Sequence, residues 1–578
     1  MKALFWIIFG FVTLLFGAFL ELNQNTIAGW ILFILLVSAF VFFSCRNISR
    51  PLLWVLYIVI YALIVFITWP PVKAVPAADC SNPVKTGTVM TENGLVRGVY
   101  TEDKSVEVYT GIPYAKPPVG ELRWCSPQDP DSWEGVRECD SFAPMSMQVT
   151  NLPVYDSLTR IIGFHDYRIS LKDNWIPPVS EDSLYLNVWK PSGEHEKLPV
   201  IVYIHGGSLQ TGQSWYSSYN GETFASNGIV TVTFGYRLGV FGFYADRELP
   251  GSGNFGLEDQ IKALEWVRDN ISAFGGDPDN VTIVGESAGA VCVDALCVSP
   301  LAKGLFRRAV LESSTLSSVA PPHSFRSYEE ALESSDDLKA RYSVSSVSEL
   351  RKLDASKIVK EMNTQHHVTV DGRLLPDTPY NLRKSGIHNE EALLHGYNLE
   401  ESGPFIIFSR AKLSNYENKV RGYFKEYADD ILSLYNPSTD EEADRYWALI
   451  YGAVFFNYPH YCLQRIASSQ GEDAYEYLFT KSNGMLSSWH SGEIMYAFGN
   501  IPEDSNLFDE SDRNLSFIMN SYWSNFARYG KPDGEGLPEF SVSADGSKLL
   551  ELGSDVKMTG EPYLKLYEIF DKMYGFKI

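Results

Sequence analysis

The chain has 578 residues, of which 45% are hydrophobic, 14% aromatic and 21% charged, and its formal net charge is −23. This composition excludes disordered, collagen-like and low-complexity proteins, while the length allows one very large domain or several ordinary ones. The excess of acidic residues lies after residue 80, so nucleic acid is not an expected partner.

Three apolar runs without a charged residue open the chain, at Ala3–Leu20, Ile27–Phe43 and Leu52–Trp69. At about 1.5 Å per residue, each reaches close to the ~30 Å hydrocarbon thickness of a bilayer as a helix. A cleaved signal peptide is the alternative, but no small-residue cleavage site follows the first run and two more runs come after it. The pattern predicts three transmembrane helices within residues 1–70, a Pro- and Ala-rich linker at 71–88 and one large domain at 89–578.

Basic residues set the expected orientation of these helices. Arg46 and Arg50 lie between the second and third runs, whereas the connection at 21–26 has no Lys or Arg. Lys2 and the 45–51 loop should therefore face the cytoplasm. Three crossings then place the large domain on the extracytoplasmic side of the cell membrane.

Cysteines give few constraints beyond this. Six of the seven follow the spans, an even number that permits disulfides without requiring them. Cys125 with Cys139 is the first pair to test, whereas Cys292 and Cys297 lie in an apolar helical stretch typical of buried thiols. No Cys/His spacing resembles a zinc site, so no metal is expected.

The large domain alternates between strands and helices. Strands are predicted at 200–204, 229–234, 281–284, 309–311 and 393–396, and helices at 257–274 and 288–298. Such alternation is typical of an α/β fold in which helices cover a mostly parallel sheet. Asn93-Gly94 predicts a hairpin turn near the start of the domain. No internal repeat divides residues 90–578, so helical insertions are expected, at 322–362 and 405–470.

A candidate nucleophile lies where one strand meets a helix. Residues 281–289 form an apolar strand that runs into Gly285-Glu-Ser287-Ala-Gly289 and then a helix. Such a sharp turn strains its central residue and needs glycines on both sides, which holds the serine hydroxyl at the top of the sheet. The bare motif occurs often by chance, but the strand and helix around it make it specific.

A tetrahedral intermediate on the serine also needs N–H donors near its oxyanion. The loop Ile204–Ser208 follows another strand and contains Gly206-Gly207, so its amides can point inward, and the Ala288 amide directly follows the serine. These backbone amides are therefore candidate donors for an oxyanion.

Serine needs a base and an orienting acid, which follow the nucleophile in the order Ser, acid, His in this architecture. The strand at 393–396 ends in a segment with two carboxylates, Glu400 and Glu401. Only His460 and His490 follow it. His460 lies in an aromatic helical stretch, where a structural role is the default, whereas His490 lies in a small-residue loop after a strand and is the better candidate.

The motifs together resemble the type-B carboxylesterase/lipase family, the cholinesterase-like branch of the α/β-hydrolases. The resemblance is carried by 274–289, and further matches are found at 109–120, 180–189, 205–207, 253–260 and 523–532. It covers about 89–570 and implies an α/β-hydrolase fold with helical cap insertions. The three N-terminal spans are not part of the family pattern.

The resemblance also implies roles for individual residues. Ser287 is matched to the nucleophile, Glu401 rather than Glu400 to the acid and His490 to the base. The resemblance likewise implies that the oxyanion hole is formed by the amides of Gly207, Ser208 and Ala288. Glu286 and Ser313 match positions near the triad, where a supporting role is expected. Ser208 replaces a family Gly or Ala, and Ser146 and Ser183 stand where many eukaryotic members have a disulfide, which suggests a bacterial-type member.

The expected activity is hydrolysis of carboxylic esters through an acyl-enzyme, with a small-molecule ester as substrate and neither cofactor nor metal. The alternative is an adhesion or scaffold protein with this fold and no activity, but all three triad residues are retained. A channel or transporter is less consistent with the sequence, because the three spans contain no acidic, basic or proline-broken segment to line a pathway.

Overall fold

The computed structural model describes residues 2–46, 48–78, 82–159, 161, 175–318, 325–360, 367–482, 488–502, 507–543 and 545–578. The chain divides into two compact units. One contains residues 1–75 and 149–178, and the other contains residues 76–148 and 179–578. The insertion at 149–178 thus groups with the N-terminal helices. The division of the chain at residues 70 and 89 stays a prediction.

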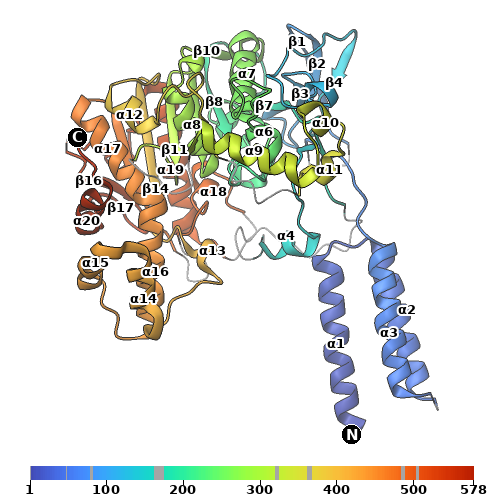
Figure 1. Ribbon diagram of the computed structural model, residues 1–578. Coiled ribbons are helices and arrows are strands. Elements are labelled where there is room, and N and C mark those ends of the chain that lie inside the picture. Colours follow the sequence, from blue (N-terminus) through green and yellow to red (C-terminus); the bar gives the residue numbers. More distant parts are fainter. Residues whose placement is uncertain are drawn as a thin grey trace. The chain divides into compact units, whose positions relative to one another are not determined.

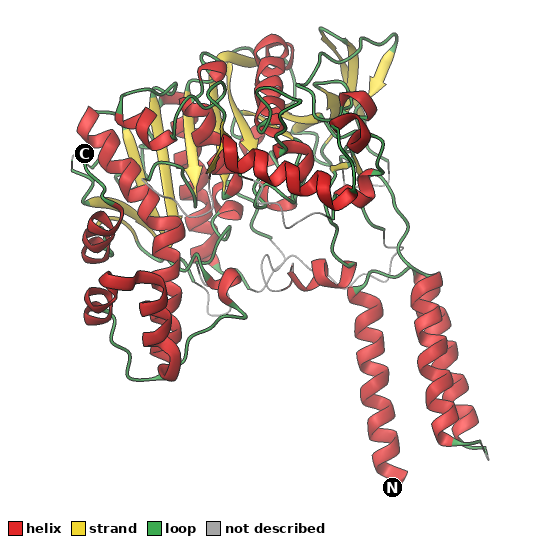
Figure 2. Ribbon diagram, viewed as in Figure 1, coloured by secondary structure: helices red, strands yellow, loops and turns green. Residues whose placement is uncertain are grey.

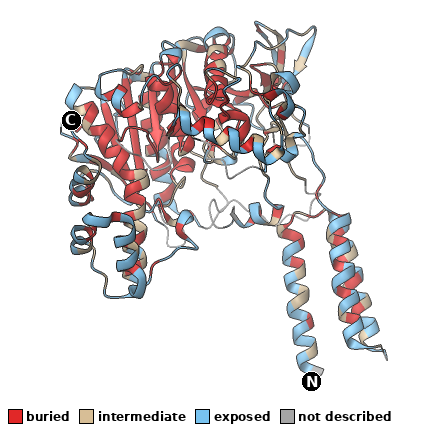
Figure 3. Ribbon diagram, in the orientation of Figure 1, coloured by how far each residue is buried: buried red, intermediate tan, exposed pale blue. Residues whose placement is uncertain are grey.

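The first unit contains the three long helices α1 (Lys2–Leu22), α2 (Ile27–Ser44) and α3 (Arg50–Ile67) (Figure 1). All three are long and apolar enough to cross a membrane, and their surfaces are mostly exposed (Figure 3). At one end, Asn25 Nδ2 donates to Val65 O and Thr68 Oγ1. The short helix α4 (Pro153–Thr159) packs near this end, where Gln24 Nε2 donates to Ser157 Oγ at 3.2 Å.

The second unit is built on one large sheet (Figure 2). The strands lie in the order β1-β2-β3-β7-β9-β8-β10-β11-β14-β15-β16-β17, and β4 pairs with β2. Their bounds are Lys85–Thr91 (β1), Gly94–Tyr100 (β2), Val106–Pro113 (β3), Val136–Glu138 (β4), Tyr185–Pro191 (β7), Leu198–Ile204 (β8), Val230–Phe234 (β9), Gly276–Glu286 (β10), Arg308–Glu312 (β11), Ala392–Asn398 (β14), Ala474–Phe479 (β15), Lys548–Leu552 (β16) and Val556–Gly560 (β17).

The middle of this sheet is parallel, from β9 through β8, β10, β11, β14 and β15 to β16. The strands at both edges pair antiparallel, including the hairpin β1–β2 at the predicted Asn93-Gly94 turn. The parallel strands are almost wholly buried (Figure 3) because helices cover both faces of the sheet. The predicted strands, and with them the mostly parallel sheet, are confirmed.

The helices that pack on the sheet include α5 (Glu222–Ser226), α7 (Phe255–Asn270), α8 (Ala288–Val298), α17 (Tyr458–Gln470) and α19 (Glu510–Tyr529). The helix α7 ends in a 3-10 turn at Ile271–Phe274, and Gly275 then adopts φ +83°, which ends the predicted 257–274 helix. The predicted helix 288–298 has the bounds of α8.

The insertions are helical, as expected. The first contains α9 (Tyr328–Tyr342), α10 (Val347–Arg351) and α11 (Ala355–Ile358). The second contains α13 (Gly403–Ile406), α14 (Leu413–Phe424), α15 (Ala428–Leu434) and α16 (Asp440–Gly452), and continues through a π-helix at Ala453–Asn457 into α17. The remaining helices are α6 (Gly239–Phe243), α12 (Pro379–Lys384), α18 (Ile494–Ala497) and α20 (Leu564–Tyr574). Four short strands also form two pairs, β5 (Met145–Ser146) with β6 (Val179–Ser180), and β12 (Phe325–Ser327) with β13 (Val368–Val370).

Cys125 and Cys139, the pair singled out as the first to test for a disulfide, are both free thiols. Cys139 is fully buried, while Cys125 Sγ donates to the Glu121 carbonyl and accepts from Arg351 Nη2. Each cysteine is therefore held in a separate environment, and Cys80 lies outside the described residues. The hydroxyls of Ser146 and Ser183 form a hydrogen bond of 3.0 Å.

Candidate active site

The candidate nucleophile occupies the turn between β10 and α8. Ser287 has φ 56° and ψ −124°, a backbone conformation that L-residues rarely adopt, and it precedes the first residue of α8. Its amide donates to Glu312 O on the neighbouring strand β11 at 2.9 Å, which fixes the turn to the sheet. The serine side chain is thereby held beyond the carboxyl ends of the central strands.

The flanking glycines are required by close backbone contacts. A Cβ on Gly289 would lie 2.0 Å from Ile204 O, and one on Gly285 would lie 2.5 Å from the Gly289 carbonyl. The start of α8 therefore packs directly against the end of β8. The glycines in the predicted motif let three backbone segments meet at this point.

One hydrogen-bonded relay connects the three predicted triad residues. His490 Nε2 lies 2.8 Å from Ser287 Oγ, and His490 Nδ1 lies 2.6 Å from Glu401 Oε2. Glu401 is buried, and the His490 side chain is only 9% exposed. The two ring nitrogens thus face a hydroxyl and a carboxylate, the arrangement in which an imidazole can move a proton.

The loops that carry the acid and the base are joined to each other. Glu400 and Trp489 form a parallel bridge, and Asn398 Nδ2 donates to Trp489 O at 2.7 Å. The Asn398 amide donates to Glu401 Oε1 at 2.7 Å, while the Glu400 side chain is exposed. Of the two candidate acids, Glu401 therefore faces His490 and Glu400 faces solvent.

The predicted oxyanion residues border the same serine. A Cβ on Gly206 would lie 3.1 Å from Ser287 Cβ, so this loop passes close to the nucleophile. Gly207 and Ser208 have φ +111° and +56°. In the described part of the chain, none of the Gly207, Ser208 and Ala288 amides donates a hydrogen bond. An unpaired amide beside a nucleophile is available to a developing negative charge.

A second layer of carboxylates supports the relay. Glu286 is buried, accepts a hydrogen bond from Ser491 Oγ at 2.6 Å and lies 3.3 Å from His490 Nε2. Ser313 Oγ donates to Glu493 Oε1 at 2.8 Å, and Asn398 Nδ2 donates to Glu493 Oε2. The predicted Glu286 and Ser313 therefore lie beside the relay.

Sequence reasoning missed Glu493, Ser491 and Asn398. Their only local signal is proximity to predicted residues. Ser491 directly follows the chosen histidine, Glu493 comes three residues after it, and Asn398 ends the strand before the acid. The other candidate base, His460, is fully buried, and its Nδ1 lies 3.1 Å from His395 Nδ1, consistent with the structural role expected for it.

Burial is the main cause of the raised pKa values of these acids. It raises the pKa of Glu286 to about 8, partly offset by the nearby His490. Burial also raises the pKa of Glu401 to about 8. The hydrogen bond from the Asn398 amide favours the charged carboxylate and so opposes this increase. It raises the pKa of Glu493 to about 7, with a further contribution from the Glu401 charge. Several carboxyls here therefore titrate near neutral pH.

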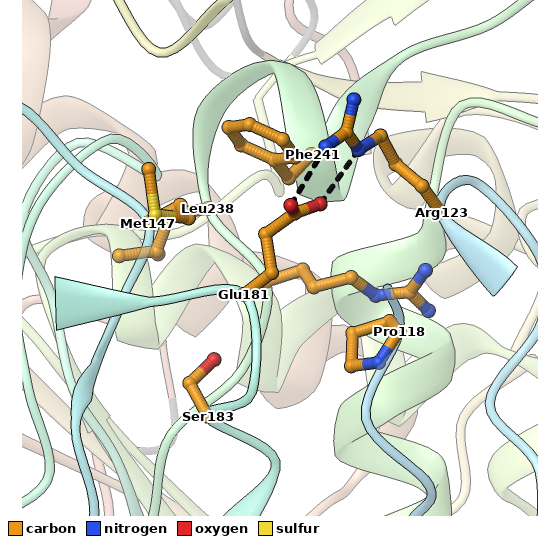
Figure 4. Close-up of a pocket in the computed structure, with 8 residues that line it drawn as sticks. Pro118, Arg123, Met147, Glu181, Ser183, Leu238 and Phe241 are labelled. Atoms are coloured by element: carbon orange, nitrogen blue, oxygen red, sulfur yellow. Dashed lines mark hydrogen bonds and ion pairs between the residues drawn. The ribbon is translucent and has the colours of Figure 1, made fainter. Parts of the chain in front are cut away.

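A separate small pocket contains none of the triad residues (Figure 4). Its lining includes Arg123 and Glu181, which form a two-bonded ion pair at 2.6 and 2.7 Å. Arg123 Nη1 also donates to the Leu353 carbonyl at 2.9 Å, which connects the pair to the turn between α10 and α11. This pocket is structural, because its charges are already paired.

The described residues contain no group of three or more His, Cys, Asp or Glu side chains arranged to hold a metal ion. The polar groups around Ser287 are instead arranged in hydrogen-bonded pairs, with one imidazole between a hydroxyl and a carboxylate. Such an arrangement is typical of serine hydrolases, in which a side-chain hydroxyl is activated by a neighbouring imidazole.

Comparison with known proteins identifies the family to which the chain is similar. A model of the carboxylesterase family matches residues 85–569. Carboxylesterase 1C of Rattus norvegicus is 31% identical over 83% of this chain and 93% of its own length. The para-nitrobenzyl esterase of Bacillus subtilis is 30% identical over 82% of this chain and 96% of its own. The crystal structure of a Geobacillus stearothermophilus carboxylesterase superposes with a TM-score of 0.71, at 29% identity, over 84% of this chain and all of that one.

The chain therefore belongs to the carboxylesterase family. The expected α/β-hydrolase fold and the expected enzyme class, a carboxylic ester hydrolase, are confirmed. The alternative of a scaffold protein without activity is not favoured by these relatives.

Proposed function

We propose that this carboxylesterase hydrolyses esters with Ser287 as nucleophile, His490 as general base and Glu401 as orienting acid. The observation that carries the proposal is the relay of 2.8 and 2.6 Å through one imidazole. Because Glu401 faces Nδ1, it favours the tautomer that leaves Nε2 free to accept the serine proton.

The reaction then follows in two halves. His490 Nε2 takes the proton of Ser287 Oγ, and Oγ attacks the ester carbonyl carbon, whose oxygen becomes the oxyanion. The amides of Gly207, Ser208 and Ala288 stabilise that charge, helped by the partial positive charge at the start of α8. The tetrahedral intermediate collapses as the alcohol leaves with the proton from His490. A water molecule, deprotonated by His490, hydrolyses the acyl-serine in the same manner and releases the carboxylic acid.

Glu286 lies against the base. Its carboxyl is 3.3 Å from His490 Nε2, the same nitrogen that faces Ser287. The hydrogen bond from Ser491 Oγ holds this buried carboxyl in place beside the imidazole. We propose a positioning role for Glu286, and a similar one for Ser313 through Glu493.

The test is a series of nitrophenyl esters from acetate to palmitate, given to the full chain in detergent and to Ser287→Ala. We expect the variant to fall to the background rate of an enzyme without its nucleophile, about 10⁶-fold below the intact protein. Equal rates in both proteins would overturn the proposal. The chain-length profile identifies the preferred acyl group.

We also propose that α1, α2 and α3 span the cell membrane, with the α2–α3 loop in the cytoplasm and the catalytic unit outside. The support is the two basic residues Arg46 and Arg50 in that loop, whereas the connection at 21–26 contains no Lys or Arg.

Cys45, exposed in the loop, provides the test of this orientation in a variant where Cys80 and Cys125 are changed to serine. A membrane-impermeant maleimide should label Cys45 only after cells are permeabilised, whereas a cysteine introduced as Tyr529→Cys should react in intact cells. The reverse pattern would overturn the orientation.

A further inference from the structure

The segment after the acid loop carries an unusual exposed apolar tip. Phe408 is fully exposed, Ile407 is 54% exposed and Phe405 is 47% exposed. We call these three residues the rim patch. They lie in and just after α13 (Figure 1). Single exposed apolar side chains are ordinary, but three such large side chains together at a protruding turn mark an interaction surface.

The rim patch adjoins the candidate active site. The Phe405 ring lies 5.1 Å from the His490 ring, and the Phe456 ring lies 4.7 Å from it on the π-helix. Phe405 and Phe456 are themselves 5.4 Å apart. An apolar surface thus runs from the imidazole outward to Phe408, so whatever covers the rim patch also meets the site.

Basic residues follow the rim patch directly. Arg410 and Lys412 are both exposed, in a chain whose formal net charge is −23. Arg410 lies 3.4 Å from Asp444, whereas Lys412 forms no ion pair within the described residues. Apolar side chains with cations beside them match the boundary of a lipid bilayer, where acyl chains lie under anionic headgroups.

The connection between the apolar helices and the catalytic unit limits which surfaces that unit can reach. Its three apolar helices are each long enough to cross a membrane. The connection from Ile67 to Lys85 reaches at most about 60 Å when extended. The catalytic unit is therefore held near a bilayer, which gives the lipid surface a high effective concentration. A fully projecting Phe408 also suits insertion between lipids better than packing into a protein groove.

We propose that the rim patch inserts into the surface of the bilayer that carries the chain, so that esters dissolved in the lipid reach His490 and Ser287 from that side. The inference rests on the proposed function and names its substrate class, apolar esters partitioned in a membrane. Phe405, Ile407 and Phe408 enter the headgroup boundary, and Lys412 meets the anionic headgroups.

Fluorescence of a dye at the tip tests insertion directly. The full chain, with Cys45, Cys80 and Cys125 changed to serine, carries either Phe408→Cys or the control Tyr529→Cys, and a nitrobenzoxadiazole dye is attached to the new thiol. Both are reconstituted in phosphatidylcholine vesicles containing phosphatidylglycerol. We expect blue-shifted emission that brominated lipids quench at position 408, and water-like emission at position 529, whose side chain is 70% exposed in the same unit. Water-like emission at both positions overturns the proposal and leaves a protein partner as the occupant.

A rate comparison tests the consequence for catalysis. In the same vesicles, the double variant Ile407→Asp with Phe408→Asp is compared with the unsubstituted chain on a bilayer-embedded palmitate ester and on water-soluble nitrophenyl acetate. We expect the ratio of the two rates to fall about tenfold, because charged side chains do not enter the apolar boundary. An unaltered ratio overturns the proposal. Loss of both rates in the unsubstituted chain would instead refute the proposed function, so the two failures are distinguishable.

Discussion

Four serines around the site have strained backbone conformations. Ser208, Ser287, Ser313 and Ser491 all have positive φ, at 56°, 56°, 57° and 70°. Residues other than glycine rarely adopt this conformation, and each such residue costs about 1–3 kcal/mol. The surrounding sheet and loops must hold them, which is how the Ser287 hydroxyl and the Ser491 hydroxyl reach His490 and Glu286.

The role proposed for Glu401 can be tested by comparison with the adjacent carboxylate, Glu400. Glu401→Gln keeps the size of the side chain but removes the charge that orients His490 and stabilises its protonated form. We expect kcat on nitrophenyl acetate to fall about 10³–10⁴-fold. The matched control is Glu400→Gln, an exposed carboxylate one residue away, which should alter kcat by no more than about twofold. Equal losses in the two variants would contradict the assignment of the acid.

Glu493 predicts a pH dependence of stability. Burial raises its pKa to about 7 in the folded protein, whereas an unfolded chain has about 4.3. Between these values the folded state holds a proton that the unfolded state has lost, so this carboxyl's contribution to the free energy of unfolding falls as pH rises from about 4.5 to 7. Glu493→Gln cannot titrate. Its Tm relative to the unsubstituted protein should therefore rise from pH 5 to pH 7.5, and a constant Tm difference over that range would exclude the effect.

At the scale of elements, the site depends on how closely α8 approaches β8 and β10. Each of the parallel strands β8, β10, β11, β14 and β15 ends at the same edge of the sheet, so the loops that follow them meet there. The loop with Gly207 and Ser208, proposed for the oxyanion, follows β8, and the proposed nucleophile follows β10. The proposed acid follows β14, and the proposed base lies beyond β15. Residues distant in sequence become neighbours for this reason.

Glycine packing at this junction gives a stability prediction. Gly289→Ala would place a Cβ 2.0 Å from the Ile204 carbonyl, so α8 must move. We expect a loss of about 1–3 kcal/mol or more in the free energy of unfolding, together with lower activity. Gly422→Ala is the control, because Gly422 lies in the exposed helix α14 with nothing within 4 Å of its Cβ position. That variant should gain about 0.5–1 kcal/mol. Chemical denaturation of both variants measures the difference.

At the scale of the whole molecule, the two compact units are unequal. The family match begins at residue 85, after the apolar helices, and the large sheet lies wholly in the second unit. Residues 149–178 group with the N-terminal helices, and in α4 Ser157 is fully buried and hydrogen-bonded to Gln24. The N-terminal unit therefore includes a segment that comes from within the residues matched to the family.

Removal of residues 1–81 tests this relation. We expect fragment 82–578 to remain in the supernatant after ultracentrifugation and to hydrolyse nitrophenyl acetate, because its sheet and core are intact. Without Gln24 and its neighbours, α4 loses its partner and should unfold locally. Chymotrypsin should then cut after Tyr155 in the fragment faster than in the full chain. Equal cleavage rates would show that α4 does not depend on the helices.

Much of this protein is determined by local sequence. The three apolar runs, the strand–turn–helix around Ser287 and the choice of His490 over His460 follow from hydrophobic patterns, glycine spacing and short-range order, which act between near neighbours in the chain. The fold class followed for the same reason, because alternating strands and helices permit few arrangements of the sheet.

Other features were decided only by the tertiary structure. The residues alone left Glu400 and Glu401 as equal candidates, and only packing shows that one faces the imidazole while the other faces solvent. Glu493 and Asn398 join the site through contacts across strand ends that no local pattern encodes. Cys125 and Cys139 do not pair, because their surroundings are set by strands and loops far away in sequence. Burial, which shifts the carboxyl pKa values, is likewise a property of the folded chain, since it depends on which segments meet in space.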